Sequence, residues 1–329
     1  MAGGTRRGGG RGRGRPRRTV CAALVAGALV LPLSAAAQPR IPAPAPAASA
    51  PATAAALDEA YAAHRAGAAE AARMAAAHGD HHRAAADRAL AAPARQLLAF
   101  DGRGAGRATE VLGDLARARH VAVLVPGSDT GLDTYGRFRA AAVALYDRLR
   151  ARAPEGTRVA VVAWLGYETP GTVSGAVATT GRAERAAPRL RALVRQLRGI
   201  TGPRAHLSLL CHSYGSVVCA RAAAGLDVGD IALVGSPGTG ADRAADLRSP
   251  ARLWAARGTG DWVEHVPHVR ARLFGTTVGF GTDPVSGRFG ARVFAAGDGG
   301  HSDYFAPGSR SLANLARIAL GETAEVSRA

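Results

Sequence analysis

Ser213 stands in the stretch of the chain that is best suited to chemistry. The apolar run of residues 207–210 predicts a buried strand, and the alanine-rich segment after residue 215 predicts a helix. The turn between them, CHSYG, is so short that it must project the Ser213 Oγ away from the backbone. The N–H of Tyr214 then lies at the start of a helix, where it can stabilise a developing negative charge. The pattern predicts a nucleophilic serine, although Cys211 stands where a G-x-S-x-G turn has its first glycine.

A nucleophilic serine needs a base that takes its proton and an acid that orients the base. His301 follows the last predicted strand, residues 292–295, and Asp261 follows the strand before it, residues 253–256. Because the carboxyl ends of parallel strands meet at one edge of a sheet, we expect both side chains to lie near Ser213. Asp283 is an alternative to Asp261 as the acid, or a residue that caps a turn.

Other polar residues near these positions have simpler structural explanations. His212 adjoins the serine, but its side chain should point the opposite way, which predicts a packing role. His265 and His268 lie in an apolar segment, and we interpret them as structural or pocket-lining. The cluster HGDHH lies at a break between helices, and adjacent ligands rarely converge on one ion. We therefore expect a solvated turn rather than a metal site at His78, Asp80, His81 and His82, and no metal or organic cofactor in the chain.

A second donor to the developing negative charge is predicted at the end of the apolar strand of residues 120–125. The strand runs into PGSDTG, a glycine-rich loop at the expected edge of the sheet. We expect the backbone N–H of Ser128 to act beside that of Tyr214, with the N–H of Asp129 as the second choice. The loop is not a phosphate cradle, because no Gly-Lys-Ser/Thr follows it.

The elements that must position these residues alternate between strands and helices. Such alternation predicts an α/β fold with a mostly parallel sheet and helices on both faces. Predicted strands cover residues 95–100, 107–112, 120–125, 158–164, 207–210, 231–234, 253–256 and 292–295. Predicted helices cover residues 57–90 (one or two helices, with Leu57, Tyr61, His64 and Ala68 on one face), 135–150, 183–198, the segment after 215, and 310–320.

Five blocks of the chain, VPGSDTG, CHSYG, GSPGTGADRAADL, ARGTGDW and GHSDYF, carry a resemblance to a known family. The chain resembles the actinobacterial α/β-hydrolase family long catalogued as a domain of unknown function, from about Arg95 to Ile318. The resemblance implies an α/β-hydrolase fold and a serine-hydrolase triad of Ser213, Asp261 and His301. It carries little information about the substrate.

The expected activity is therefore that of a serine hydrolase, with carboxylic esters as the first choice of substrate. The same triad could instead serve an amidase or peptidase. A different class of function, a non-catalytic binding module at the cell surface, is compatible with the basic composition. The expected partner is a small-molecule or lipid-like ester, with an anionic cell-wall or membrane surface as a further partner.

The N-terminus has the pattern of an export signal. Seven arginines within the first eighteen residues precede an apolar stretch, residues 20–33, and Ala35-Ala36-Ala37 supplies a cleavage site before Gln38. Residues 1–37 are thus interpreted as a signal of the Sec or twin-arginine type, and we expect a secreted or surface-associated protein. A Pro/Ala linker (38–56), an N-terminal helical segment (57–92) and an α/β-hydrolase domain (93–329) follow.

Charge and cysteine content complete the expectations. The net charge is +17 and every basic residue is arginine, but no groove-reading motif supports a nucleic-acid partner. Cleavage of the export signal would leave Cys211 and Cys219 as the cysteines of the exported protein. Both flank the predicted turn at Ser213. We expect both to be small core residues rather than a disulfide.

Overall fold

The fold was analysed in a computed structural model that describes Met1 and residues 41–48, 53–273 and 276–329. Apart from Met1, the predicted export signal lies outside these described residues. None of the helices in the described ranges combines the length and the apolar character needed to cross a membrane.

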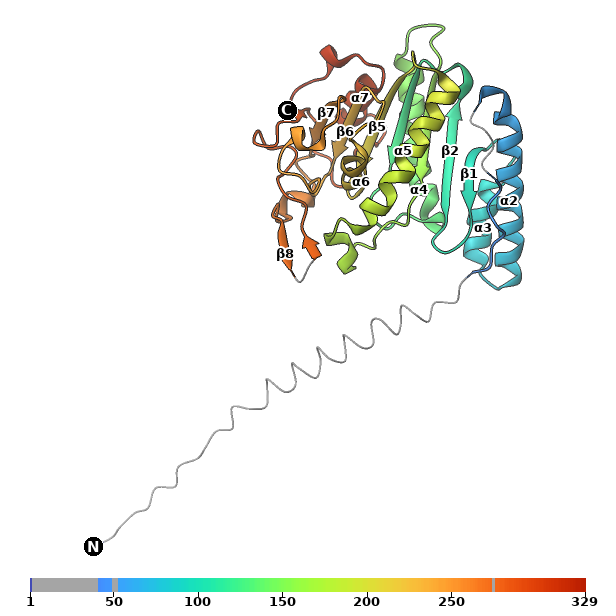
Figure 1. Cartoon of the computed structure of the whole chain (residues 1–329), viewed down its shortest axis with the longest axis horizontal. Helices are drawn as coiled ribbons and strands as arrows, with labels where there is room; N and C mark the ends of the chain where they lie inside the picture. Colours follow the sequence, from blue (N-terminus) through green and yellow to red (C-terminus); the bar gives the residue numbers. More distant parts are fainter. Residues whose placement is uncertain (2–40, 49–52, 274–275) are drawn as a thin grey trace. The chain divides into compact units, whose positions relative to one another are not determined.

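An eight-stranded sheet forms the centre of the fold (Figure 1), with the strand order β1-β2-β4-β3-β5-β6-β7-β10. Strand β2 runs antiparallel to its neighbours β1 and β4, whereas the strands from β4 to β10 are parallel. The strands are β1 (Gln96–Asp101), β2 (Arg107–Gly113), β3 (His120–Val125), β4 (Val159–Leu165), β5 (His206–His212), β6 (Asp230–Val234), β7 (Arg252–Ala256) and β10 (Arg292–Val293). The predicted α/β fold with a mostly parallel sheet is confirmed.

Helices cover both faces of this sheet, and a small hairpin lies outside it. The helices are α2 (Leu57–Ala77), α3 (His81–Leu90), α4 (Tyr135–Arg152), α5 (Gly181–Thr201), α6 (Gly215–Ala222) and α7 (Arg310–Ala319). The hairpin of β8 (Ala271–Leu273) and β9 (Thr276–Val278) was not predicted from the sequence. Short 3₁₀ helices occur in the loops, including η3 (Leu132–Thr134) and η6 (Trp262–His265).

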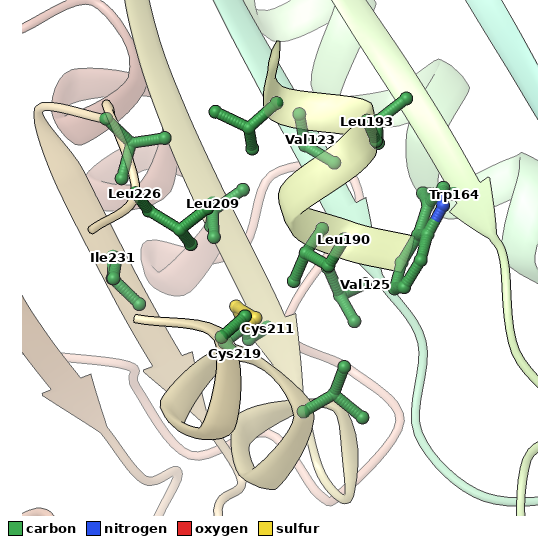
Figure 2. Packing of buried hydrophobic residues seen from close by; sticks show 14 of the residues in the cluster. Val123, Val125, Trp164, Leu190, Leu193, Leu209, Cys211, Cys219, Leu226 and Ile231 are labelled. Atoms are coloured by element: carbon green, nitrogen blue, oxygen red, sulfur yellow. A yellow bond between two sulfur atoms is a disulfide. The ribbon is translucent and has the colours of Figure 1, made fainter. Parts of the chain in front are cut away.

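Alternation along the strands divides the core into two layers. In β3, Val121, Val123 and Val125 join the cluster that contains residues of α5 and α6, as Figure 2 shows in part. Ala122 and Leu124 join the opposite cluster, with residues of α4 and α7. Each fully buried valine or leucine contributes about 1.5–3 kcal/mol relative to an exposed one, so both layers hold the sheet in place.

The N-terminal helices α2 and α3 cover the edge of the sheet at β1. The predicted buried face of α2 is confirmed, because its buried residues include Leu57, Tyr61, His64 and Ala68. Part of the predicted linker also contacts the domain. Ala43 packs against the cluster that includes Ala71 and Phe100. The predicted linker thus touches the folded domain at Ala43.

Candidate active site

Ser213 occupies a strained turn between β5 and α6. Its φ of 53° lies in the left-handed region, which is uncommon for a residue other than glycine. Its N–H donates to the carbonyl of Val234, the last residue of β6, at 2.9 Å. A Cβ on Gly215 would lie only 2.6 Å from the carbonyl oxygens of both Val125 and Pro126, so only glycine fits there. The close approach of β3 to this turn therefore requires the second glycine of the motif.

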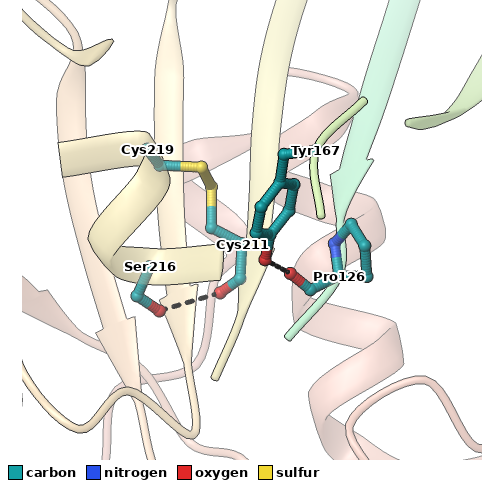
Figure 3. Close-up of a disulfide and its surroundings, with 5 residues drawn as sticks. All are labelled: Pro126, Tyr167, Cys211, Ser216 and Cys219. Carbon is teal, nitrogen blue, oxygen red and sulfur yellow. Dashed lines mark hydrogen bonds between the residues drawn. A yellow bond between two sulfur atoms is a disulfide. The ribbon is translucent and has the colours of Figure 1, made fainter. Parts of the chain in front are cut away.

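The expectation of two unpaired core cysteines was wrong, because Cys211 and Cys219 form a disulfide (Figure 3). Both residues are buried in the larger core cluster, as expected. The sharp turn at Ser213 folds α6 back over the end of β5, which brings residues eight positions apart into bonding reach. The cysteine that replaces the first glycine of the motif thus ties the turn to the helix.

The structure brings Ser213, His301 and Asp261 together in one hydrogen-bonded chain. The Nε2 atom of His301 lies 3.0 Å from the Oγ of Ser213. The Nδ1 atom lies 2.9 Å from Oδ1 and 3.1 Å from Oδ2 of Asp261. With the proton on Nδ1, Nε2 is free to accept the serine proton, as a general base must. Asp261 is 2% exposed and follows β7, at the edge of the sheet where β5 also ends.

The loop after β3 packs closely against Ser213. A Cβ on Gly127 would lie 2.6 Å from the Cβ and 3.1 Å from the Oγ of Ser213. The N–H of Asp129, the second choice as a charge-stabilising donor, already donates to the carbonyl of Pro170 at 3.0 Å. Within the described ranges, the N–H groups of Ser128 and Tyr214 donate to no protein acceptor. These two groups remain available for a substrate oxygen.

Comparison with known proteins decides the family. The family model for "alpha/beta hydrolase" matches residues 101–271, more than half of the chain. The chain belongs to the α/β-hydrolase family. This agrees with the resemblance stated from the sequence and with the parallel sheet around Ser213.

Relatives of this α/β-hydrolase occur in mycobacteria. It is 30% identical over 258 residues to the Mycobacterium tuberculosis protein Rv2079, an alignment that covers 68% of this chain and 38% of the relative. It is 32% identical over 178 residues to Rv0963c of the same species, covering 50% of this chain and 66% of the relative. The chain thus spans less than two thirds of either relative.

Solved structures similar to this α/β-hydrolase share little sequence with it. The serine hydrolase XC6422 from Xanthomonas campestris is 21% identical, with a TM-score of 0.40 and coverage of 66% of this chain and 88% of that one. Esterase PE8 is 18% identical, with a TM-score of 0.43 and coverage of 66% and 97%. The assignment to the family rests on the family model rather than on these two similarities.

Tyr304, which was not predicted from the sequence as a site residue, completes the surroundings of Asp261 in this α/β-hydrolase. Its hydroxyl donates to Asp261 Oδ2 at 2.5 Å and accepts from the N–H of Gly258 at 3.0 Å. Burial alone would raise the pKa of Asp261. Hydrogen bonds from His301, Tyr304 and the N–H of Val263 outweigh that effect and hold the pKa below its ordinary value. Asp261, the predicted acid beside His301, is therefore kept ionised.

Two further rings contact His301. His212 has more than the packing role expected from the sequence, because its Nε2 lies 2.7 Å from the carbonyl oxygen of His301. Burial and the nearby His301 lower the pKa of His212 to about 4, so the ring is neutral at pH 7 and donates from Nε2. Its ring centroid lies 4.7 Å from that of His301. Trp262 approaches His301 equally closely, at 4.7 Å, and is 52% exposed.

The residues interpreted as structural have structural partners. Asp283, the alternative acid, accepts from Arg257 at 2.6 Å and from the N–H of Val285 at 3.1 Å, which makes it an ion-pair and turn residue. His268 lies 3.7 Å from the same carboxylate. In the HGDHH cluster, Asp80 caps α3 by accepting from the N–H of Arg83. Among the described residues, no group of three His, Cys, Asp or Glu side chains is placed to hold a metal ion.

Proposed function

We propose that this α/β-hydrolase is a serine hydrolase that cleaves carboxylic esters after export from the cell. One observation carries the proposal: Ser213, His301 and Asp261 form a continuous hydrogen-bonded chain. The chain begins at a serine held on a strained turn. When a serine is aligned with an imidazole and a buried carboxylate, its hydroxyl is activated as a nucleophile.

In the proposed reaction, Ser213 Oγ attacks the carbonyl carbon of the ester while His301 Nε2 takes its proton. The carbonyl oxygen becomes an oxyanion, which accepts hydrogen bonds from the N–H groups of Ser128 and Tyr214. His301 then returns the proton to the leaving alcohol, and an acyl-enzyme remains. Water attacks the acyl-enzyme by the same route, with His301 as the base, and releases the acid and the free serine.

Ester hydrolysis is the preferred reaction because an alcohol leaves a tetrahedral intermediate more readily than an amine does. A panel of p-nitrophenyl esters with acyl chains of increasing length, beside matched p-nitroanilides, tests this preference on the purified protein. We expect ester cleavage that is lost in Ser213→Ala and retained in Asp283→Asn. Cleavage of anilides at comparable rates would replace the esterase by an amidase. No cleavage of either series by folded protein would favour the binding module.

The disulfide supports the proposal of export, because disulfides form and persist in oxidising compartments such as the periplasm and the cell exterior. The arginine-rich N-terminus and the Ala35-Ala36-Ala37 site are the other support. Expression of the full chain in an actinobacterial host tests it. We expect protein outside the cytoplasm that begins at Gln38. A cytoplasmic protein that keeps its first residues would contradict export.

A further inference from the structure

A buried arginine connects the N-terminal helices to the loop beside Ser213. The side chain of Arg83, on α3, is only 3% exposed. Its Nε and Nη2 atoms donate to the two carboxylate oxygens of Asp133 at 2.7 and 2.8 Å. Its Nη1 atom donates to the carbonyls of Gly102 and Gly104 at 3.2 and 3.1 Å. A guanidinium with partners on all three nitrogens has one preferred position, so α3 and Asp133 are held at a defined separation.

Asp133 lies in η3, which directly follows the oxyanion loop, residues 126–131. The end of this loop is bonded to η3 through Thr134, whose Oγ1 donates to the carbonyl of Asp129 and accepts from the N–H of Gly131, both at 3.0 Å. The N–H of Leu132 donates to the carbonyl of Ala105 at 3.1 Å. A displacement of Asp133 would therefore be passed to Asp129, the residue next to Ser128.

The other side of the oxyanion loop is held by the segment after β4. The N–H of Asp129 donates to Pro170, and its carboxylate accepts from the N–H of Thr172 at 3.1 Å. The N–H of Thr130 donates to Thr169 Oγ1 at 3.1 Å. Arg83 and this segment thus anchor the loop from two separate parts of the chain.

The oxyanion loop needs such anchors because its backbone is strained. Asp129 has a φ of 54°, in the left-handed region that a residue other than glycine adopts only when its surroundings impose it. The strained residue adjoins the proposed donor, the N–H of Ser128. A small rotation at Asp129 would change the direction of that N–H, and a misplacement of about 1 Å can cost an enzyme about 100-fold in rate.

We propose that Arg83 is a positioning residue which, through Asp133, holds the oxyanion loop and the N–H of Ser128 in place. The N-terminal helical segment then helps to position the groups of the active site. This inference rests on the proposed function, in which Ser128 stabilises the oxyanion. The Arg83 guanidinium also holds the pKa of Asp133 below its ordinary range, so the pair stays ionised at neutral pH.

Asp133→Asn is the most informative variant, because the substitution keeps the shape of a side chain that is 39% exposed and removes its charge. Asp114→Asn is a matched control. Asp114 is 41% exposed, caps the 3₁₀ helix Leu115–Arg117 and pairs with Arg117. This helix precedes β3, whereas the oxyanion loop follows β3 at the other end of the strand. We expect Asp133→Asn to lower kcat for ester hydrolysis about 10- to 100-fold with KM within about twofold of the wild type. Asp114→Asn should change neither constant.

Arg83→Lys provides the conservative variant. Lysine keeps the charge but cannot donate to both oxygens of Asp133 and to two carbonyls in one geometry. Arg83→Met removes both the charge and the hydrogen bonds and should lower kcat. We expect the kcat of Arg83→Lys to lie between those of the wild type and of Arg83→Met. A wild-type kcat in Arg83→Lys would show that charge alone is needed and would overturn the positioning role of the guanidinium.

Hydrogen exchange on the same proteins separates this inference from the proposed function. In Asp133→Asn, peptides that cover residues 126–134 should exchange faster, whereas peptides that cover β5 and α6 should not change. Unchanged exchange in the loop with unchanged kcat would overturn the inference, and so would faster exchange along the whole domain. If the wild type has no hydrolase activity, the proposed function fails, while loop-specific exchange would still support the anchoring by Arg83.

Discussion

Tyr304 and His301 bind the two sides of one buried carboxylate. The Tyr304 hydroxyl donates to Asp261 Oδ2 at 2.5 Å, and His301 Nδ1 lies 2.9 Å from Oδ1. Tyr304 and His301 belong to one short block, GHSDYF, so a single turn of the chain carries both the base and the group that fixes its acid. The orientation of the imidazole therefore depends in part on a phenol outside the hydrogen-bonded chain of Ser213, His301 and Asp261.

Removal of the Tyr304 hydroxyl should impair Asp261 as the group that orients His301, without removing its carboxylate. In Tyr304→Phe, Asp261 loses one of the hydrogen bonds that lower its pKa, and the Gly258 N–H loses its acceptor. We expect the pKa of Asp261 to rise and kcat to fall about tenfold, with a loss of about 1–3 kcal/mol in stability. Steady-state kinetics and urea unfolding measure both effects. The control variant Tyr146→Phe, on α4, should change neither kcat nor stability. A wild-type kcat in Tyr304→Phe would show that Asp261 does not depend on the Tyr304 hydroxyl.

The two candidate acids can be separated by parallel amide variants. Asp261→Asn keeps the shape of the side chain but favours the wrong tautomer of His301, so we expect kcat to fall about 10³- to 10⁴-fold. Asp283→Asn breaks only the pairs with Arg257 and His268 and should retain kcat within about threefold. Ester kinetics of the two proteins give the comparison directly. The opposite ranking would make Asp283 the acid.

The disulfide should contribute to stability. The bond closes a short loop between Cys211 and Cys219, and the loss of such a cross-link costs about 2–3 kcal/mol in the chain-entropy model. We expect dithiothreitol to lower the thermal unfolding temperature of the wild type. The Cys211→Ala/Cys219→Ala protein should already unfold at the lower temperature and should not respond to the reductant. Two free thiols in the folded, non-reduced protein would show that the bond does not form.

A buried acid on α3 should make stability depend on pH. Asp87 is 1% exposed, and burial raises its pKa from 3.8 to about 7 although Arg83 opposes the shift. Between about pH 4 and pH 7 the folded chain therefore holds a proton that the unfolded chain has lost, and stability falls as the pH rises.

Asp87→Asn should remove this contribution to the pH dependence. From pH 4 to pH 8, the free energy of unfolding of Asp87→Asn should rise relative to that of the wild type by on the order of 2–4 kcal/mol. Urea unfolding at several pH values measures the difference. Asp147→Asn, at an exposed position of α4, serves as the control. A difference that does not vary with pH would show that Asp87 is ionised throughout.

Much of the central fold could be predicted because its signals are local. The apolar run of β3 has the predicted bounds, and the strand, turn and helix around Ser213 follow from adjacent residues. The positions of Asp261 and His301 followed from the rule that loops at the carboxyl ends of parallel strands meet. The strand predicted over residues 292–295 is longer than β10, which holds only two residues. The apolar pattern continues past β10, but Phe294 forms an isolated bridge with Arg328 instead.

The missed features depend on contacts between distant parts of the chain. The hydrogen bond from His212 to the carbonyl of His301 spans 89 positions, and nothing near His212 in the sequence indicates it. The ion pair between Arg83 and Asp133 spans 50 positions and joins two elements that no local pattern connects. The Cys211–Cys219 bond required knowledge of how far α6 folds back over β5.

The most direct test of the central claim is to find where a fluorophosphonate probe reacts. The wild-type protein is labelled, digested and analysed by mass spectrometry beside Ser213→Ala and His301→Ala. We predict a single phosphonyl adduct on Ser213 in the wild type, none in Ser213→Ala, and labelling slowed at least about 100-fold in His301→Ala. An adduct that persists in Ser213→Ala, or a folded wild type that does not react, would contradict the account.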